Sequence, residues 1–274
     1  MNAARTIVKL GGNVRAFVVV GGPMGDRLLD LLASENVPIV EHRVVGETSY
    51  SLAVTDEETD EQFRFTLPGS LMSHGEAQVL LDRISGTVPR EGLVVLSGGV
   101  ALGLAEDFPQ QVQDIVLRKN VRLIVDTSKA PLLCLINTPV APLDVLRLDR
   151  SETEKAVGDP IRSIADNIAF TSSLVQRGVA QIVVTGHGAE GSVMVAGDQK
   201  FFCHAPQVPV RSKIGAGDAL VGAFTMSLSR GDLPAQALKW GVAAAAATVS
   251  TEGTALCERA ETEALLPECR LERF

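Results

Sequence analysis

The segment KIGAGDALVGAF, residues 213–224, joins a glycine-rich loop to an apolar stretch with helical spacing. Gly215 and Gly217 lack a Cβ atom, so the backbone of this loop can approach a ligand closely. The free N–H groups at the start of the expected helix form an anion site, and the carboxylate of Asp218 could take a proton from an attacking hydroxyl group. An ordinary helix start, in which Asp218 only complements the helix dipole, fits the same residues.

Two upstream segments favour the ligand-binding interpretation. The segment VVTGHGAEG, residues 183–191, is a β-branched run that ends in a glycine-rich turn, which could pass under the phosphates of a nucleotide; a plain β-turn explains it as well. Asp149 and Glu152 follow another apolar run, and open α/β sheets bind ligands beyond the carboxyl ends of their strands. Two acids there could hold hydrated Mg²⁺ through water, whereas a helix N-cap with an acid at the third helical position is the simpler alternative.

Short apolar runs rich in β-branched residues alternate with helical patterns along the chain. The runs are nearly continuous in apolar character, as expected of strands that are buried on both faces. This alternation predicts an α/β fold with a doubly wound, mostly parallel sheet flanked by helices. The expected strands are 16–20, 93–96, 121–125, 145–148 and 182–185. The expected helices are 26–35, 108–119, 161–177, 218–229 and 235–249.

Residues 37–68 interrupt this alternation, because they contain strand patterns and no helical one. The strand patterns cover 39–45, 50–55 and 63–67, and the acidic residues 56–61 predict a hairpin turn between the last two. Both a surface meander and a small β-lid over a cleft are consistent with this pattern.

The composition excludes several classes of protein. The 274 residues carry a net charge of −8, so a partner held by its phosphate backbone, such as nucleic acid, is not expected. No apolar run is long enough to cross a membrane, and the first residues contain no signal-peptide core, which predicts a cytoplasmic location without a membrane partner. The four cysteines form no C-x-x-C pair and are expected to be reduced thiols.

These segments together resemble the ribokinase/PfkB family of carbohydrate kinases over nearly the whole chain. The resemblance is strongest to the hexose-phosphate branch, which contains the minor bacterial 6-phosphofructokinase, 1-phosphofructokinase and tagatose-6-phosphate kinase. Residues 215–218 match the family's G-A-G-D signature. The other matching elements are Asp149-x-x-Glu152 for N-x-x-E, residues 185–191 for S-x-G-x-x-G, residues 62–69 for R-F-x-x-P-G, and Ser97-Gly98-Gly99 for the start of S-G-S-L-P-P-G.

The resemblance implies ATP-dependent phosphoryl transfer to a hydroxyl group of a sugar phosphate, with ATP and Mg²⁺ as cofactors. It also supports the lid interpretation, with a β-lid at residues 37–68, a nucleotide-binding α/β domain at 1–36 and 69–274, and a homodimer formed through the lid. The site residues that it implies are Asp218 as catalytic base, Gly215, Ala216 and Gly217 as anion hole, Arg147, Thr185, Gly188 and Gly191 for ATP, Asn2 for the sugar, and Asp149 and Glu152 for the metal.

Several residues depart from the family pattern. Asn2 matches the Asn of the G-G-x-G-x-N motif, so the family's first strand and its sugar-binding Asp have no counterpart before it. Arg147 replaces a Lys, Asp149 replaces an Asn, and Lys213 replaces a small hydroxyl residue. A non-catalytic nucleotide-binding relative that lacks a complete sugar pocket is therefore an alternative, and a misplaced initiation site would explain the short start equally well. A third alternative, a Rossmann oxidoreductase, lacks a dinucleotide fingerprint.

Overall fold

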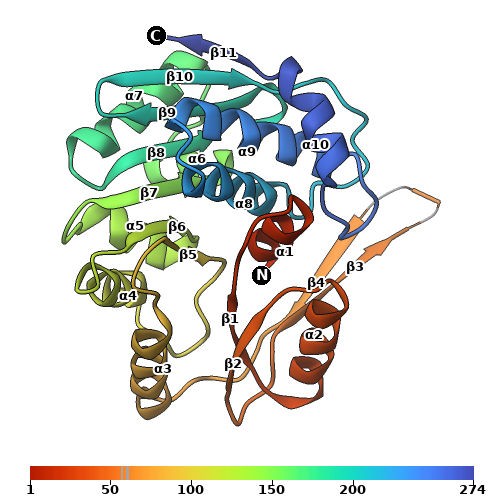
Figure 1. The fold of residues 1–274 in the computed structure, drawn as a ribbon, viewed down its shortest axis with the longest axis vertical. Coiled ribbons are helices and arrows are strands. Elements are labelled where there is room, and N and C mark those ends of the chain that lie inside the picture. Colours follow the sequence, from red (N-terminus) through yellow and green to blue (C-terminus); the bar gives the residue numbers. More distant parts are fainter. Residues whose placement is uncertain (57, 60–61) are drawn as a thin grey trace. The chain divides into compact units, whose positions relative to one another are not determined.

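The computed structural model describes residues 1–56, 58–59 and 62–274, and divides them into two compact units (Figure 1). The larger unit comprises residues 1–14, 88–99 and 106–274, and the smaller one comprises residues 15–87 and 100–105. The predicted lid, residues 37–68, lies inside the smaller unit, which extends beyond it on both sides. The extension toward the N-terminus includes the strand at 16–20, which pairs with the strand at 39–43.

The larger unit is built on a seven-stranded sheet with the order β11-β10-β9-β8-β7-β6-β5. Strands β5 to β8 are mutually parallel, whereas β9, β10 and β11 are each antiparallel to the preceding strand, so five of the seven strands run in one direction. The strands are β5 (Leu93–Ser97), β6 (Arg122–Asp126), β7 (Leu143–Leu148), β8 (Ala180–Gly186), β9 (Gly191–Ala196), β10 (Gln199–His204) and β11 (Arg270–Arg273).

Helices cover both faces of this sheet, which confirms the doubly wound α/β prediction (Figure 1). Along β9, Val193 and Val195 pack against Ile168 of α7, while Met194 packs in the core that α8 and α9 form on the opposite face. This alternation is the period of two expected of a strand buried on both sides. The helices are α1 (Asn2–Lys9), α4 (Phe108–Leu117), α5 (Lys129–Asn137), α6 (Arg150–Val157), α7 (Ile164–Gln176), α8 (Ala216–Ser229), α9 (Pro234–Val249) and α10 (Arg259–Leu265), with short 3₁₀ helices η1 (Gly188–Glu190) and η2 (Leu266–Glu268).

Two of the expected strands are not buried on both faces, which corrects the prediction from their apolar runs. Strand β1 (Ala16–Val20) lies outside the main sheet and pairs in parallel only with β2 (Ile39–Arg43), with alternate burial along its length. Strand β5 is half-buried at every position, because it is the last strand of the described sheet. An apolar run predicts a strand but not which strand it pairs with.

The rest of the smaller unit consists of helices α2 (Gly22–Ser34) and α3 (His74–Thr87) and a hairpin of β3 (Tyr50–Thr55) and β4 (Gln62–Leu67). The hairpin is the one that the sequence predicts. Of its expected tip, Glu57, Asp60 and Glu61 lie outside the described residues, and the Oδ1 atom of Asp56 accepts hydrogen bonds from the next described N–H groups. In the described part of the chain, no helix has the length and apolar character needed to cross a membrane.

Candidate active site

Polar residues form a row across the carboxyl end of the parallel strands. Ser97 of β5 lies opposite Asp126 of β6, Asp126 lies opposite Arg147 of β7, and Arg147 lies opposite Val184 of β8. Residues opposite one another in a sheet point to the same face. Val184 belongs to the core beneath α8 and α9, so Ser97, Asp126 and Arg147 lie on the face that α8 covers.

The glycine-rich segment forms the beginning of α8, and glycine suits the backbone at 215 and the close packing at 217. Gly215 is the N-cap with φ of +82°, a left-handed conformation that glycine adopts without strain. At Gly217, a Cβ atom would lie 2.7 Å from Nη2 of Arg147, so this guanidinium lies directly against the first turn of α8. Residues Gly215, Ala216 and Gly217 are the N-cap and the first two residues of α8, where backbone N–H groups lack partners within the helix, and Arg147 places a cation next to Gly217.

Both oxygens of the Asp218 carboxylate are held by side chains from other elements. Oδ2 accepts a hydrogen bond of 3.0 Å from Nδ2 of Asn2, and Oδ1 accepts one of 3.3 Å from Oγ of Ser97. Nη1 of Arg5 in turn donates to Oδ1 of Asn2 over 3.0 Å. Helix α1 can place Asn2 there because Gly222 allows close contact, since a Cβ atom at that position would lie 2.6 Å from a carbonyl oxygen of α1. The half-buried carboxylate therefore has a fixed orientation at the start of α8.

Arg147 and Asp126 form an ion pair of 3.1 Å in which the side chains are only 15% and 10% exposed. Burial raises the pKa of Asp126; the charge of Arg147 opposes this shift, and the carboxylates of Asp218 and Asp149 add to it. Burial alone would lower the pKa of Arg147, but the carboxylates of Asp126, Glu152 and Asp149 raise it, and the pKa lies above its usual value. Nε of Arg147 is buried with no hydrogen-bond partner among the described residues, so this donor is unsatisfied.

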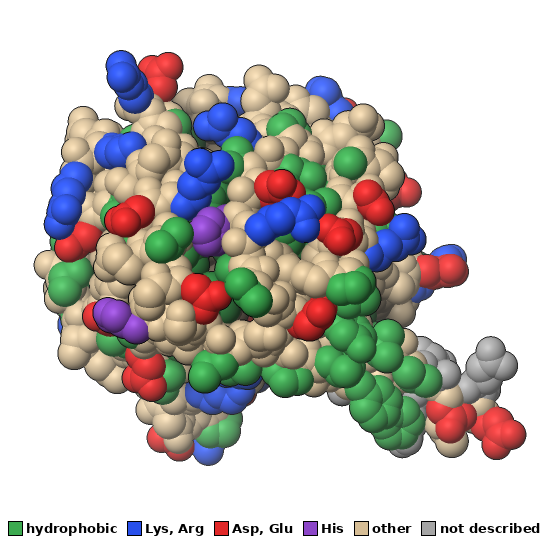
Figure 2. Space-filling model, turned by 90° about the horizontal axis from the view of Figure 1, so that it is seen from below, with side chains coloured by type: hydrophobic (Ala, Val, Ile, Leu, Met, Phe, Trp, Pro, Cys, Tyr) green, Lys and Arg blue, Asp and Glu red, His purple; other side chains and the backbone are tan. Residues whose placement is uncertain are grey.

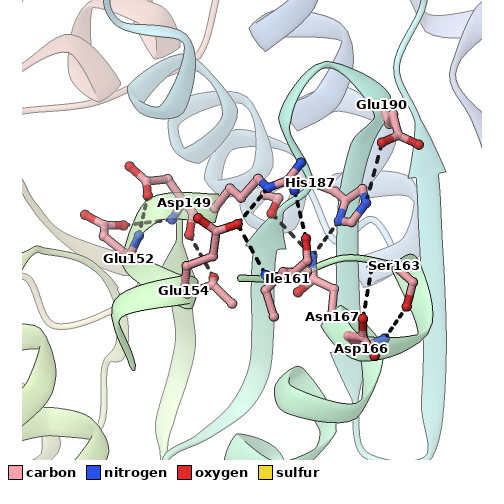
Figure 3. A network of polar contacts seen from close by, with 12 residues as sticks. Asp149, Glu152, Glu154, Ile161, Ser163, Asp166, Asn167, His187 and Glu190 are labelled. Carbon is pink, nitrogen blue, oxygen red and sulfur yellow. Dashed lines mark hydrogen bonds and ion pairs between the residues drawn. The ribbon is translucent and has the colours of Figure 1, made fainter. Parts of the chain in front are cut away.

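Asp149 and Glu152 form the N-terminal cap of α6. Oδ1 of Asp149 accepts from the N–H of Glu152 over 2.7 Å, and Oε2 of Glu152 accepts from the N–H of Asp149 over 2.7 Å (Figure 3). This is the capping arrangement that the sequence left as an alternative to a metal site, yet the second oxygen of each carboxylate takes no part in it. Burial raises the pKa of Glu152, and the charges of Asp149 and Asp126 contribute to the same shift.

These acids are suited to a hydrated cation rather than to direct ligation. Among the residues that the structure describes, no three His, Cys, Asp or Glu side chains converge closely enough to bind a metal ion. Mg²⁺ keeps much of its water shell and is commonly held by one or two carboxylates together with substrate phosphates. In addition to burial, the charge of Asp149 raises the pKa of Asp126 and of Glu152, and the charge of Asp126 raises that of Glu152. A bound cation would reduce this mutual repulsion.

The predicted nucleotide turn, residues 185–191, packs against the start of α6. A Cβ atom at Gly186 would lie 3.4 Å from the backbone nitrogen of Arg150. The N–H of His187 donates to the carbonyl oxygen of Gly191 over 2.8 Å and closes the turn. Gly188, with φ of +69°, is exposed at the turn, whereas Gly191 is buried, and a Cβ atom there would lie 2.0 Å from a carbonyl oxygen of β10.

The hydroxyl group of Thr185 faces inward. It is buried, donates to Oδ1 of Asn167 over 2.7 Å and lies 2.8 Å from the hydroxyl group of Thr171. We therefore expect Thr185 to shape the turn rather than to contact ATP through its side chain.

The structure brings most of the predicted site residues into two adjoining groups. Asn2 and Arg147 contact the segment 215–218, and Asp149 and Glu152 adjoin the turn at 185–191. Sequence reasoning missed Asp126, although it directly follows the expected strand 121–125 and carries the same signal that singled out Asp149. It named Ser97 only as part of a resemblance and gave it no role.

Comparison with known proteins identifies the family of this chain. Residues 1–261 match the family described as pfkB family carbohydrate kinase. ATP-dependent 6-phosphofructokinase isozyme 2 of Mycobacterium tuberculosis is 33% identical over 264 residues, which are 96% of this chain and 76% of that protein. Phosphofructokinase-2 from Escherichia coli in complex with potassium has a TM-score of 0.90 and 28% identity, over 97% of this chain and 85% of that chain. The tetrameric inhibited form of the same enzyme gives a TM-score of 0.88 and 27% identity, over 97% and 85% of the two chains. The chain therefore belongs to the pfkB family of carbohydrate kinases.

Proposed function

We propose that this kinase transfers the γ-phosphoryl group of ATP to a hydroxyl group of a hexose phosphate, as a 6-phosphofructokinase does. One observation carries the proposal: the Asp218 carboxylate lies at the N-terminus of α8, oriented by Asn2 and Ser97, and the cation Arg147 lies against the preceding residue, Gly217. A fixed carboxylate next to an anion site is the combination that phosphoryl transfer to an alcohol needs.

In this mechanism Asp218 accepts the proton of the acceptor hydroxyl group as the new P–O bond forms, while the bond between the γ-phosphorus and the bridging oxygen breaks and ADP leaves with that oxygen. The N–H groups of residues 215–217 and the positive end of the α8 dipole stabilise the charge that develops on the phosphoryl oxygens. Arg147 adds a cation next to Gly217. Asn2 orients the base through its Nδ2 atom, and its contact with the sugar stays a prediction.

ATP would lie along the turn at 185–191, where the exposed Gly188 lets the phosphates approach the backbone. Mg²⁺, when bound, neutralises charge on the phosphate oxygens and aligns them for in-line transfer. Asp149 and Glu152, with Asp126 behind them, would hold that ion through water.

The cytoplasmic location expected from the sequence also stays a prediction.

The direct test is a transfer assay with ATP, Mg²⁺ and fructose 6-phosphate, fructose 1-phosphate or tagatose 6-phosphate as acceptor. We expect ADP and a doubly phosphorylated sugar in equal amounts, with fructose 6-phosphate as the preferred acceptor. Calorimetric binding of ATP without transfer to any of the three sugars would support the alternative, a non-catalytic nucleotide-binding relative.

Substitution of Glu152 by Gln is expected to raise the Mg²⁺ concentration for half-maximal activity about tenfold, the scale found for groups that support a metal from its outer shell. Because the pKa of Glu152 is raised, its protonation begins at a higher pH than in a free chain. The Mg²⁺ requirement of the wild type should therefore increase as the pH falls through the mildly acidic range, whereas that of Glu152→Gln should change less.

A matched control exists for this change. Gln preserves the capping hydrogen bond of Glu152, and Asp166 occupies the same position in the capping box of α7, where it is exposed. Asp166→Asn should leave the Mg²⁺ requirement unchanged. If Glu152→Gln and the wild type reach half-maximal activity at the same Mg²⁺ concentration, Glu152 is not part of the metal site.

We also propose that the β3–β4 hairpin joins two copies of the chain. The cross-strand pairs Leu52–Phe65 and Val54–Phe63 lie on one face of the hairpin, and their side chains are 48–56% exposed. Figure 2 shows apolar side chains gathered over this region. An isolated two-stranded hairpin is marginal in water, and a contiguous exposed apolar face indicates an interface. A second copy is the occupant we favour, because the E. coli relative is known in a tetrameric form.

Phe65→Asp should therefore dissociate the assembly to a species of 29.0 kDa, the mass of one chain. A charge placed in an apolar interface lacks a partner and opposes association. Thr66→Asp is the matched control, since Thr66 pairs with Ser51 across the hairpin over 3.1 Å and points to the opposite face. Light scattering after gel filtration measures both variants, and an unchanged mass for Phe65→Asp would refute the hairpin interface.

A further inference from the structure

His187 lies inside the nucleotide turn, and the proposed mechanism gives it no role. Its side chain is almost completely buried, at 3% exposed, and its ring packs edge-on against Phe202 with centroids 5.9 Å apart. Figure 3 shows the ring between Asn167 of α7 and Glu190 of the turn. A histidine buried in this way has to satisfy both ring nitrogens.

The hydrogen bonds of Asn167 determine which ring nitrogen of His187 carries the proton. Nδ2 of Asn167 donates to the carbonyl oxygen of Gly186 over 3.3 Å, and Oδ1 accepts from the hydroxyl group of Thr185 over 2.7 Å. A carbonyl oxygen can only accept, so the amide orientation is fixed. The same Nδ2 lies 3.3 Å from Nδ1 of His187, and Nδ1 must therefore be the unprotonated acceptor.

The remaining nitrogen of the ring faces the turn itself. With Nδ1 unprotonated, a neutral imidazole carries its hydrogen on Nε2, which lies 3.6 Å from Oε1 of Glu190. Asn167 thus holds three consecutive residues, Thr185, Gly186 and His187. The turn is closed at its other end by the bond from the His187 N–H to Gly191.

We infer that His187 is a positioning residue for the nucleotide: as an acceptor at Nδ1, it ties the turn to α7 and so fixes the backbone of Gly188 beneath the ATP phosphates. The inference rests on the proposed function, because it assumes that this turn binds the nucleotide. We expect His187 to affect the binding of ATP and not the binding of the sugar phosphate. The carboxylate of Asp218, the start of α8 and the acceptor sugar are held by other residues.

Two polar substitutions separate this role from simple packing. The amide oxygen of Asn can occupy the position of Nδ1, whereas the amide of Gln reaches the position of Nε2. We expect His187→Asn to keep the KM for ATP within about twofold of the wild type, and His187→Gln to raise it about fivefold, the size of one buried hydrogen bond. In both variants kcat and the KM for the sugar phosphate should stay unchanged.

His204 supplies the matched control. It packs edge-on against the same Phe202 ring, with centroids 4.7 Å apart, but pairs with Glu272 over 3.0 Å outside the turn. His204→Gln should leave the KM for ATP unaltered. Equal KM values for ATP in His187→Asn and His187→Gln would overturn the inference, and so would a loss of kcat that accompanies the change in KM.

The dissociation constant for ATP, measured by calorimetry, tests the role of His187 separately from the proposed reaction. If the wild type binds ATP but transfers no phosphoryl group, the proposed function fails, and the ratio of ATP dissociation constants for the two His187 variants still tests the positioning role. A fivefold weaker Kd for His187→Gln than for His187→Asn supports it. The same Kd for both contradicts it.

Discussion

Substitution of Asp218 by Asn is expected to lower kcat about 10²-fold or more, while the dissociation constant for ATP changes little. A correctly placed general base contributes about 10²–10⁴-fold to the rate, and an amide cannot accept the proton of the acceptor hydroxyl group. The side chains have the same shape, and the N–H groups of residues 215–217 stay in place. The decrease should therefore appear in kcat, measured by ADP formation, and not in ATP binding measured by calorimetry.

The opposite end of α8 provides the control for this experiment. Asp232 accepts a hydrogen bond of 2.6 Å from the hydroxyl group of Ser227, as Asp218 accepts one from Ser97, but it lies beyond the C-terminal end of the helix. Asp232→Asn should retain the turnover of the wild type. If Asp218→Asn keeps more than about a tenth of that turnover, Asp218 is not the base.

Substitution of Arg147 by Met should cause the largest loss of stability, about 3–5 kcal/mol in the free energy of unfolding, the usual result of removing one partner of a buried ion pair. Asp126 would then be buried without its cation and close to two further carboxylates, Asp218 and Asp149. Phosphoryl transfer should also decrease, because Arg147 lies against the anion site at Gly217.

The loss should depend on pH in a defined direction. The pKa of Asp126 is already raised by burial, and loss of Arg147 raises it further. The folded state then binds a proton that the unfolded state releases, so stability falls as the pH rises from the unfolded pKa to the folded one. Urea unfolding should show a larger loss for Arg147→Met at pH 8 than at pH 5, and a second change, Asp126→Asn, should restore part of the stability at pH 8.

Strands β6 and β7, which contain Asp126 and Arg147, also contain a control pair. Arg122 of β6 and Asp144 of β7 lie 3.5 Å apart at the other end of the sheet, with side chains 45% and 22% exposed. Exposed pairs contribute about 0–1 kcal/mol, so Arg122→Met should have a small effect that depends little on pH. Equal losses for the two arginine variants would show that burial of the Arg147 pair has no special consequence.

The fold class and the start of α8 could be predicted from local sequence, because both depend on spacing along a single segment. The glycine at 215 and the helix from 216 onward lie where the loop and the apolar stretch meet. The pairing of β1 could not be predicted in this way, since β1 and β5 have the same apolar character and differ only in their neighbours. Strand pairing is set by contacts between distant segments, which periodicity does not report.

The candidate site shows the same limit. Asp126 becomes part of it through its register with Ser97 and Arg147, and no local pattern contains that register. The inward orientation of the Thr185 hydroxyl group depends on Asn167, which comes from a different helix. Sequence could identify Asp149 and Glu152 as a pair, but both a cap and a metal site require the same spacing.

The polar row across β5, β6 and β7 also has a consequence for how the enzyme is assembled. Each of its members comes from a different strand, and a slip of one residue between two strands would turn one of them to the opposite face. A partly folded chain could contain all its helices and every catalytic side chain and still be inactive. Catalytic competence therefore requires the native register between β5, β6 and β7, in addition to the presence of the strands.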